Sequence, residues 1–515
     1  MYHLSHQARI RPDAPALIMA DGGAITTFAE LNSASNRGAQ LLRSLGLKRS
    51  DRFAIWSGSN QRYLEIAWAM QRSGLYMVMI PARLTVEDAA YIVNDSGASV
   101  VIVSVALGEK VSIFANQAAS DCPAARHIFS LCGEIAGLAS WEAATAAMPA
   151  KEIADPSFGR PMIYSSGTTG PSKGVFMPLL DDPFDDMTNF LQVHQAKDVT
   201  PGSIFATTAP LYHSGPMWMS LSEQAMGATV LLFEKFDPEA VLAAIDRYKV
   251  ERGQFVPTMF VRMLKLPQEV REHCDVSSIR LIMHAAAPCP VETMRAMIDW
   301  WGPVFVDLYS GAEGIGLTII TSAEWLRKPG SVGKSVGGRI IISGEDGNEL
   351  PPGQEGVVYF ETRSEFTYLG DPEKAKRAFH PTIPGAATLG DVGYVDAEGY
   401  LFLTDRLSFK INSGGNNIFP QEIEDLLIQH PAVRDAAVFG IPDEDMGELV
   451  KAVVESQPGF SPGVRLEAEL LEFCRARLAI FKCPRSVDFT EQLPRDPSGK
   501  LYKRELRDLY RKERA

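Results

Sequence analysis

Along the first hundred or so residues, hydrophobic and polar positions alternate between a helical and a strand-like period. Residues 27–30 can form a capping box, and apolar residues then recur at helical spacing from Leu31 until Gly46 closes the segment. The pattern next predicts, in order, a strand at 53–56, a helix at 63–72, a strand at 76–80, a helix at 85–95 and a strand at 100–103. This βαβαβ order favours a mainly parallel sheet covered by helices on both faces.

After Arg406 the pattern changes to that of a compact α+β unit of about a hundred residues, within the usual size of a domain. Its predicted helices are 420–429 and 466–478, and its predicted strands are 433–439, 450–454 and 486–489. The preceding segment 371–393, rich in Pro, Gly and charge, is expected to lie on the surface. Because 515 residues exceed what one hydrophobic core can fill, two or more domains are expected.

Composition narrows the class of protein. A hydrophobic fraction of 46% and a charged fraction of 22% are ordinary for a globular protein, and the net charge of −13 argues against a broad nucleic-acid surface. The six cysteines form no CxxC pair and no Cys/His cluster at metal spacing, which suits a reducing cytosol. The first residues lack the order of a signal peptide, and no apolar run approaches the ~20 residues of a membrane span. A soluble cytoplasmic protein is therefore expected.

The stretch most informative about chemistry is residues 164–174, with the sequence YSSGTTGPSKG. Its three glycines let backbone amides approach a phosphate closely, and its hydroxyls and lysine add hydrogen-bond donors. Anion binding is the natural use of such a loop, and a solvated hairpin is the structural alternative. The candidate phosphate ligands are Ser165, Ser166, Gly167, Thr168, Thr169, Gly170 and Lys173.

Two other glycine motifs must be weighed against this loop. It is not a Walker A loop, and Gly333-Lys334-Ser335, which imitates the end of one, has Lys328 in place of the first glycine. Residues 170–174 and 333–337 both match the G-x-S-x-G pattern of serine hydrolases, whose nucleophile needs a strand before it and a helix after it. Neither match has those neighbours in the predicted pattern, so a serine hydrolase is kept only as an alternative of another class.

The phosphate loop resembles the [ST]-S-G-T-T-G-x-P-K-G segment of the adenylate-forming superfamily, of the acyl-CoA synthetase or fatty-acid–CoA ligase type. Ser172 stands where proline is usual, and further matching segments follow in order along nearly the whole chain. The resemblance implies an α/β fold. It implies a large N-terminal domain at 1–405 with mainly parallel sheets in helical layers, a hinge at 406–408, and a small mobile α+β C-terminal domain at 409–515.

Several segments resemble those that surround the acid, the adenine and the metal in this family. The segment 227–240 also matches, and it is expected to pack as a strand and a helix. Glu313, with Thr168, is implied to hold Mg²⁺, which prefers carboxylate and phosphate oxygens. Ser310 and Ala312 depart from the usual Gly and Thr. The implied acyl-pocket residues are His213, His284, Ala285 and Gly311, and the implied adenine and adenylate contacts are Ala286, Ala287, Pro288, Tyr309, Ser310, Gly311, Ala312 and Glu313.

The remaining motifs imply the ribose site and a moving lid. Asp391 matches the aspartate that accepts both ribose hydroxyls, and Arg406 matches the second ribose contact. Ser408 stands at the hinge, where the family usually has Asp or Lys. The loop that lines the pantetheine tunnel in relatives corresponds to Ser413, Gly414 and Gly415, and the catalytic lysine of the L-P-R-x-x-x-G-K motif corresponds to Lys500.

These motifs together imply an acid–CoA ligase that uses ATP, Mg²⁺ and coenzyme A. The acid would attack ATP to give an acyl-adenylate and pyrophosphate, and the thiol of CoA would then displace AMP. The implied catalytic residues are Lys500, His213, Glu313 and Thr168. Taken singly, His213, Glu313 and Lys500 would each be an ordinary loop or surface residue; their shared order along the chain favours the functional role.

The sequence does not identify the acid. The resemblance favours a hydrophobic acid of fatty, aromatic or steroid side-chain type. A carrier-protein pantetheine is the alternative acceptor, and a binding-only protein with a degenerate site is a further alternative. The expected partners are the acid, ATP and CoA, with no nucleic acid and no membrane span; a homodimer is left open.

Overall fold

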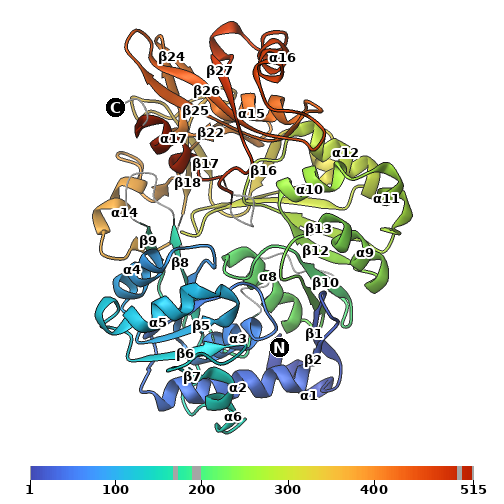
Figure 1. Cartoon of the computed structure of the whole chain (residues 1–515). Helices are drawn as coiled ribbons and strands as arrows, with labels where there is room; N and C mark the ends of the chain where they lie inside the picture. Colours follow the sequence, from blue (N-terminus) through green and yellow to red (C-terminus); the bar gives the residue numbers. More distant parts are fainter. Residues whose placement is uncertain (1, 166–171, 188–198, 363, 496–500, 513–515) are drawn as a thin grey trace.

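The computed structural model describes residues 2–165, 172–187, 199–362, 364–495 and 501–512. Within these residues the strands form three sheets, which Figure 1 shows together. Two large sheets and their helices form the body of the molecule. The third and smallest sheet, formed after Arg406, lies at one end of that body.

The eight-stranded sheet carries the predicted N-terminal βαβαβ unit. Six of its strands run parallel. At one edge β9 pairs antiparallel with β8, and β19 pairs antiparallel with β9. Strands β3, β4 and β5 match the predicted strands, and nearly all of their residues are buried, as in a sheet covered on both faces. In spatial order the strands are β19 (Thr367–Tyr368), β9 (Lys173–Phe176), β8 (Arg160–Ser165), β4 (Tyr76–Ile80), β3 (Arg52–Trp56), β5 (Val100–Ser104), β6 (His127–Leu131) and β7 (Ala139–Ser140).

The larger sheet is mixed, with a parallel half and an antiparallel half. The parallel half contains β14 (Phe305–Ser310), β13 (Leu281–His284), β12 (Arg252–Phe255), β10 (Ile204–Thr207), β11 (Thr229–Leu232) and β1 (Pro15–Met19), with β2 (Ile25–Thr27) antiparallel at its edge. The antiparallel half contains β15 (Leu317–Thr321), β16 (Ser331–Ser335), β22 (Leu401–Arg406), β21 (Asp391–Val395), β18 (Gly356–Glu361), β17 (Ile340–Ser343) and the short β20 (Ala386–Ala387). The expectation of mainly parallel sheets holds for the first half and not for the second.

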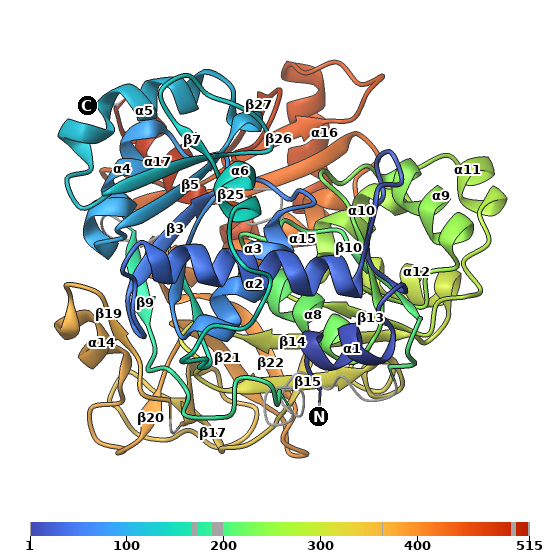
Figure 2. The same ribbon diagram turned by 90° about the horizontal axis from the view of Figure 1, so that it is seen from below.

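A completely buried helix, α3 (Tyr63–Ser73), helps to join the two large sheets. One hydrophobic core contains residues of α3 together with strand residues from both sheets, and the Trp68 indole N–H donates to the Gln224 side-chain oxygen of α8 (Ser214–Ala225) at 2.8 Å. Figure 2 shows α2 (Phe28–Ser44) across one face of the body, near α1 (Leu4–Ile10) and α6 (Trp141–Ala146). The other helices of the body are α4 (Val86–Ser96), α5 (Glu109–Asp121), α9 (Pro238–Tyr248), α10 (Pro257–Leu264), α11 (Gln268–His273), α12 (Val291–Trp301), α13 (Ser322–Trp325) and the short 3₁₀ helix η1 (Val105–Leu107).

Local sequence signals set several of these boundaries. The predicted capping box is present, because Thr27 Oγ1 accepts from the Glu30 amide at 3.2 Å and the Glu30 carboxylate accepts from the Thr27 amide at 2.8 Å. Helix α2 ends before Gly46, which has a φ of +88°. The segment 227–240 contains β11 and the start of α9, as expected.

The unit after Arg406 has its own sheet and core. Its predicted helices and strands are all present, and its two long strands extend several residues beyond their predictions. The strands are β24 (Asn416–Ile418), β23 (Ile411–Ser413), β26 (Gly447–Ser456), β25 (Val433–Asp443) and β27 (Ser486–Thr490), and the helices are α15 (Pro420–Ile428), α16 (Val464–Arg475) and α17 (Lys503–Lys512), with 3₁₀ turns η2 (Leu407–Phe409) and η3 (Ile480–Lys482). The division at 405 and 409 remains a prediction.

The expectation that residues 371–393 form a surface segment is wrong in part. The segment contains α14 (Pro372–Ala378), all of β20 and the start of β21, and Ala375, Ala386 and Ala387 are buried. Pro372 occupies the first turn of a helix capped by Asp371, a position where proline is favoured. Proline therefore marked a helix start rather than a loop.

The Gly333-Lys334-Ser335 motif has a structural explanation. It lies within strand β16, where the ladder to β22 shifts register between Ser331 and Gly333. Gly333 has a φ of +96°, and a Cβ atom there would collide with the carbonyl oxygen of Ile319. Neither G-x-S-x-G match has the geometry of a hydrolase nucleophile: β9 follows Ser172, and Ser335 ends a strand that leads to β17.

No helix in the described part of the chain is both long enough and apolar enough to cross a membrane.

Substituting Gly333 tests this explanation. We expect Gly333→Ala to lower the free energy of unfolding by more than about 3 kcal/mol, because backbone strain and a backbone clash act together. Gly337→Ala is the matched control, since Gly337 has a φ of +122° but open space around it, and should cost only about 1 kcal/mol. Denaturant unfolding measures both; equal losses would contradict the role of the clash.

Candidate functional site

The carboxyl ends of the parallel strands in the larger sheet gather several predicted site segments. Strands β10, β12, β13 and β14 are parallel neighbours, so the chain leaves all four at the same edge. The segment with His213 follows β10, residues 285–288 follow β13, and residues 311–313 follow β14. Ligands of open α/β sheets bind at this kind of edge, in the crevice outside the carboxyl ends of the strands.

The predicted ribose residues form one hydrogen-bonded group with the predicted adenine tyrosine. Asp391 and Arg406 are cross-strand partners on β21 and β22, and the Arg406 Nε donates to Asp391 Oδ1 at 3.0 Å. The Tyr309 hydroxyl, from the end of β14, donates to Asp391 Oδ2 at 2.5 Å. Burial, followed by the charge of Asp391, raises the pKa of Tyr309 well above its usual value, so this hydroxyl stays a donor at neutral pH. Each carboxylate oxygen retains a second lone pair with which to accept from a sugar hydroxyl.

Glu313 connects the two large sheets. The Tyr368 hydroxyl, on β19 of the smaller of the two, donates to Glu313 Oε1 at 2.8 Å, and the Ser364 hydroxyl donates to the Glu313 carbonyl at 2.7 Å. The Lys374 ammonium lies 4.1 Å from the centroid of the Tyr368 ring. Burial, followed by the Glu313 charge, raises the pKa of Tyr368. The carboxylate of Glu313 is thus held in one orientation from across the sheet boundary.

The turn that carries Glu313 explains its neighbours. A side chain at Gly311 would collide with Leu389, which accounts for the glycine. The Ser310 hydroxyl donates to the carbonyl of Gly316 at 2.8 Å, so the residue that replaces the usual glycine closes the turn. Ala312, like Tyr309, is partly buried against the core that contains Ile315 and Phe360.

The chemistry of Glu313 fits the expected Mg²⁺. Mg²⁺ bound with a nucleotide takes one or two protein carboxylates and completes its shell with phosphate oxygens and water. Among the described residues no group of three or more His, Cys, Asp and Glu side chains could enclose a metal by itself. A single carboxylate such as that of Glu313 suits a metal held mainly by the phosphates of the substrate. Its expected companion Thr168 lies outside the described residues.

The segment after β13 is strained and accessible. Ala286 has a φ of +79°, a backbone conformation that a residue with a Cβ adopts rarely and at a cost of about 1–2 kcal/mol. The resembled motif has glycine at this position. Ala286 and Pro288 are exposed, and Ala285 and Ala287 are partly exposed, so a flat ring can reach the segment.

His284 ends β13 directly before this segment and is 1% exposed. Neither ring nitrogen has a hydrogen-bond partner within the part of the chain that the structure describes, and Nδ1 lies 3.5 Å from the carboxylate Oδ1 of Asp307. Burial lowers the pKa of His284 to about 3 and raises the pKa of Asp307 to about 7. The imidazole is therefore neutral at physiological pH. The edge of its ring contacts Phe260, at 5.5 Å between centroids.

His213 stands at the start of α8. It is the residue before the helix, half-buried, with its amide donating to the Pro210 carbonyl at 3.2 Å and its ring tilted against Tyr212. Because His213 follows β10, it lies at the same edge of the larger sheet as the segments that follow β13 and β14.

The predicted phosphate loop connects β8 to β9. Its central residues, from Ser166 through Gly170, lie outside the described residues, while Ser165 ends β8 and Lys173 begins β9. The Lys173 ammonium lies 3.5 Å from Asp95 Oδ1, and the Tyr164 hydroxyl donates to Asp95 Oδ2 at 2.9 Å. The Tyr91 hydroxyl donates to the Ser172 carbonyl at 3.0 Å. Helix α4, which carries Asp95 and Tyr91, therefore supports the exit of the loop.

The residues expected to bind CoA lie in the small unit, away from the sheet edge just described. Ser413 ends β23, and Gly414 and Gly415 form the turn to β24, with φ values of +55° and +79°. Figure 1 shows β24 on the outer side of the small sheet, and both glycines are exposed. Ser408 lies in the 3₁₀ turn η2, which joins the large sheet to the small unit.

Lys500 lies outside the described residues, but its neighbours are informative. The guanidinium of Arg83 lies 3.7 Å from the centroid of the Tyr502 ring. Arg83 follows β4, which runs parallel to β8, so it leaves the sheet at the same edge as the phosphate loop. The segment two residues after Lys500 therefore lies at the edge where the phosphate loop begins.

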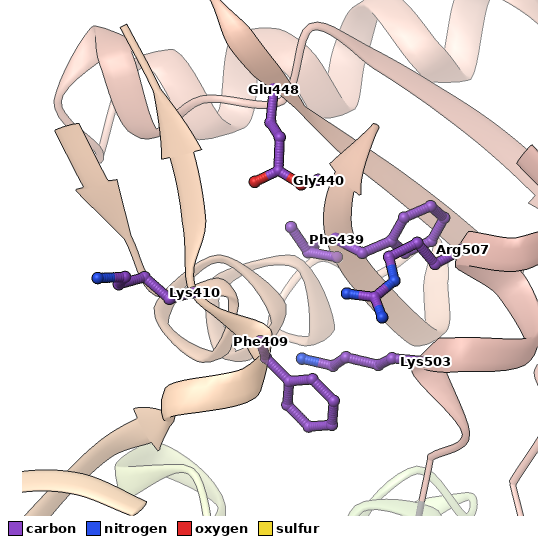
Figure 3. A pocket seen from close by; sticks show the side chains of 8 residues that line it. Phe409, Lys410, Phe439, Gly440, Glu448, Lys503 and Arg507 are labelled. Atoms are coloured by element: carbon purple, nitrogen blue, oxygen red, sulfur yellow. The ribbon is translucent and has the colours of Figure 1, made fainter. Parts of the chain in front are cut away.

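A pocket within the small unit is separate from this arrangement. Figure 3 shows Phe409, Lys410, Phe439, Gly440, Glu448, Lys503 and Arg507 around it. The Lys503 ammonium forms a buried ion pair with Glu424 at 2.8 Å and lies 5.0 Å from the Phe409 ring centroid. The pocket lies between η2, strands β25 and β26, and helix α17.

The sequence did not single out four residues that the structure brings to these segments. Tyr368 orients Glu313, Asp95 pairs with Lys173, Asp307 faces His284, and Asp405 precedes Arg406 on β22. Asp405 had a local signal, an acid beside a predicted ribose contact, and Asp307 lies on β14 close to the predicted Tyr309. Tyr368 and Asp95 come from elements far along the chain from their partners.

Comparisons with known proteins agree with this arrangement. A family model described as AMP-binding enzyme matches residues 4–367, and a model of the AMP-binding enzyme C-terminal domain matches residues 422–500. Feruloyl-CoA synthase from an Amycolatopsis species is 33% identical over 507 residues, which cover 97% of each chain. The fatty acid–[acyl-carrier-protein] ligase ScoC from Streptomyces coeruleorubidus is 30% identical, covering 99% of this chain and 95% of its own. The structure of ATP-bound MatB from Rhodopseudomonas palustris matches with a TM-score of 0.79 and 26% identity, covering 100% of both chains.

The first family model spans more than half of the chain, and the two curated relatives match it nearly from end to end. The chain therefore belongs to the AMP-binding enzyme family, within the adenylate-forming superfamily that its motifs resemble, and is an AMP-forming acid–thiol ligase that uses ATP, Mg²⁺ and coenzyme A.

Proposed function

We propose that this chain activates a hydrophobic monocarboxylic acid, of fatty, aromatic or steroid side-chain type, as its acyl-adenylate and transfers the acyl group to CoA. The observation that carries the proposal is the Tyr309–Asp391–Arg406 group, at the end of the strands that lead to Glu313 and to the hinge. It supports a site for the adenosine part of a nucleotide. The comparisons support the reaction class.

The first step makes the carboxylate reactive. A carboxylate is a poor electrophile, because its charge repels nucleophiles and it has no good leaving group. One of its oxygens attacks the α-phosphorus of ATP, the bond to the β-phosphate oxygen breaks, and pyrophosphate leaves. The product is a mixed anhydride of the acid and AMP, with the electrophile now at the acyl carbon.

In this step the residues of the chain position ATP and stabilise the negative charge on its phosphates. Asp391 and Arg406 hold the ribose, and Tyr309 stacks on the adenine while its hydroxyl fixes the Asp391 carboxylate. Lys500 and Lys173, with the amides of residues 166–170, receive the phosphates. Mg²⁺, when bound by Glu313 and Thr168, neutralises charge on the phosphate oxygens. Fixed cations and amides of this kind contribute about 3–4 kcal/mol each to a transition state.

The second step uses a different face of the small unit. The thiol sulfur attacks the acyl carbon, the bond to the AMP oxygen breaks, and AMP leaves with the negative charge on its phosphate. We propose that rotation about Ser408 withdraws Lys500 and brings the Ser413–Gly415 turn to the site. The outward position of that turn in the present arrangement supports two lid positions, one for each step.

The substrate class rests on two independent supports. Ala285 and Ala287 present short, partly exposed side chains at the sheet edge, and the neutral, buried His284 adds no charge there. Feruloyl-CoA synthase and the fatty-acid ligase ScoC act, by name, on acids with a large apolar part. ScoC delivers to a carrier protein, which makes a carrier-protein pantetheine the second candidate acceptor.

An acid panel tests the substrate proposal. With ATP, Mg²⁺ and CoA present, we expect thiol-dependent AMP release to be at least about tenfold faster in kcat/KM with a medium-chain fatty acid or an arylpropenoic acid than with acetate, since each buried CH₂ adds about 0.8 kcal/mol. Carrier protein in place of CoA is the parallel arm. Preferential activation of acetate would refute the proposed acid class.

Removal of Lys500 tests its assigned role. We expect Lys500→Ala to slow acid-dependent ATP–pyrophosphate exchange by at least about 100-fold, because a fixed cation at the phosphates is lost. Thioester formation from supplied acyl-adenylate should change less than about threefold. Lys334→Ala is the control: Lys334 lies on β16, and its ammonium is 4.4 Å from the centroid of the Tyr400 ring. Undiminished exchange by Lys500→Ala would contradict the assignment.

Tyr368 tests the placement of the metal ligand. We expect Tyr368→Phe to raise the Mg²⁺ concentration for half-maximal exchange by about tenfold, since a residue that orients a metal ligand contributes to affinity at that level. Tyr394→Phe, which deletes a hydroxyl from a ring stacked on Phe402 at 4.9 Å, should leave the Mg²⁺ dependence unchanged. An identical Mg²⁺ dependence in both variants would argue against Glu313 as the metal ligand.

A further inference from the structure

Strand β22 ends in Asp405 and Arg406, whose side chains lie on opposite faces of the sheet. Successive side chains of a strand point to opposite faces. Arg406 reaches Asp391 in the nucleotide group, whereas Asp405 is buried and reaches the small unit. The Asp405 Oδ2 accepts from the main-chain N–H of Gln421 at 2.9 Å, and Oδ1 accepts from the N–H of Arg406 at 2.6 Å.

The Gln421 amide belongs to a helix end that lacks a side-chain cap of its own. Helix α15 begins at Pro420, and the preceding Phe419 makes no side-chain capping bond. The first amides of a helix have no partner within it, and Asn, Asp, Ser or Thr usually supplies one from the position that Phe419 occupies. Asp405 supplies the acceptor from another part of the chain, and its negative charge suits the positive end of the helix dipole.

This cap spans the predicted hinge. Asp405 precedes residues 406–408 and Gln421 follows them, so a large rotation about Ser408 would separate the carboxylate from the amide. Two other contacts accompany it: Arg83 on the Tyr502 ring, and the Lys265 ammonium, which donates to the Val433 carbonyl at 2.6 Å. Together they keep the neighbours of Lys500 at the phosphate-loop edge.

We infer that Asp405 is a positioning residue for adenylate formation: it caps α15 from across the hinge and so favours the lid position in which Lys500 can reach ATP. The inference rests on the proposed two-step function. The Asp405 carboxylate accepts from the main-chain amides of Arg406 and Gln421. It links β22, which ends at the predicted ribose contact Arg406, to α15, the first α-helix of the small unit.

The test compares the two half-reactions in the full-length chain. We expect Asp405→Ala to lower the ratio of the pyrophosphate-exchange rate to the rate of thioester formation from supplied acyl-adenylate by about fivefold, the usual effect of deleting a helix cap. The loss should lie in kcat for exchange. A variant that folds poorly loses both rates together, so the ratio still reports on the lid.

Three variants serve as controls. Asp405→Asn keeps an oxygen acceptor and should restore most of the ratio. Gln421→Ala keeps the main-chain donor and loses only the side-chain bond to Asp425, so its ratio should match that of the unaltered protein. Asp237→Ala removes the cap of α9, where Asp237 accepts from the Ala240 amide at 2.9 Å, and should affect stability without changing the ratio.

Two results would overturn the inference while leaving the proposed function intact. One is an unchanged ratio in Asp405→Ala. The other is a raised KM for ATP with unchanged kcat, which would mean that Asp405 acts only through Arg406. Absence of any acid-dependent exchange in the unaltered protein would instead overturn the proposed function itself.

Discussion

The buried carboxylate of Asp391 is the constraint on which the site depends. A buried charge is stable only if it is paired and hydrogen-bonded, and Asp391 meets both conditions through Arg406 and the Tyr309 hydroxyl. Those partners come from β22 and β14, which lie apart in the larger sheet. The need to pair one carboxylate thus fixes the distance between β14, which carries the predicted adenine residue Tyr309, and β22, which ends at the predicted hinge.

The larger sheet, part parallel and part antiparallel, brings Tyr309, Asp391 and Arg406 together. The parallel half of the larger sheet brings the predicted acyl and adenine segments to one edge, and the antiparallel half brings the Asp391 and Arg406 partners of Tyr309 on β21 and β22. The second sheet contributes from the other side, through the Tyr368 bond to Glu313 and the exit of the phosphate loop. The candidate site is thus held by bonds between two sheets. Among the described residues, the contacts between the body and the unit that follows β22 include η2, the Asp405 and Lys265 hydrogen bonds, and Arg83 on the Tyr502 ring.

Local signals predicted much of this fold, and non-local ones were missed. The Thr27–Glu30 capping box and the apolar strand at 76–80 are written within a few residues, so periodicity and capping rules were enough. The antiparallel half was missed because strand direction in a sheet is set by pairing between distant segments, and the helix at 372–378 was missed because a proline-led helix resembles a loop in sequence. The motif resemblance predicted roles for Tyr309, Asp391 and Arg406. No local pattern could predict that Tyr368 orients Glu313, because the two residues are 55 positions apart in the chain.

The proposed function depends on cleavage of ATP between its α- and β-phosphates by an acid held at this sheet edge. Acid-dependent exchange of labelled pyrophosphate into ATP, measured with a long-chain or aromatic acid and no thiol, reports on that step alone. We expect exchange that requires both the acid and Mg²⁺ and proceeds without CoA. Thioester formation accompanied by ADP and phosphate, with no exchange, would contradict it.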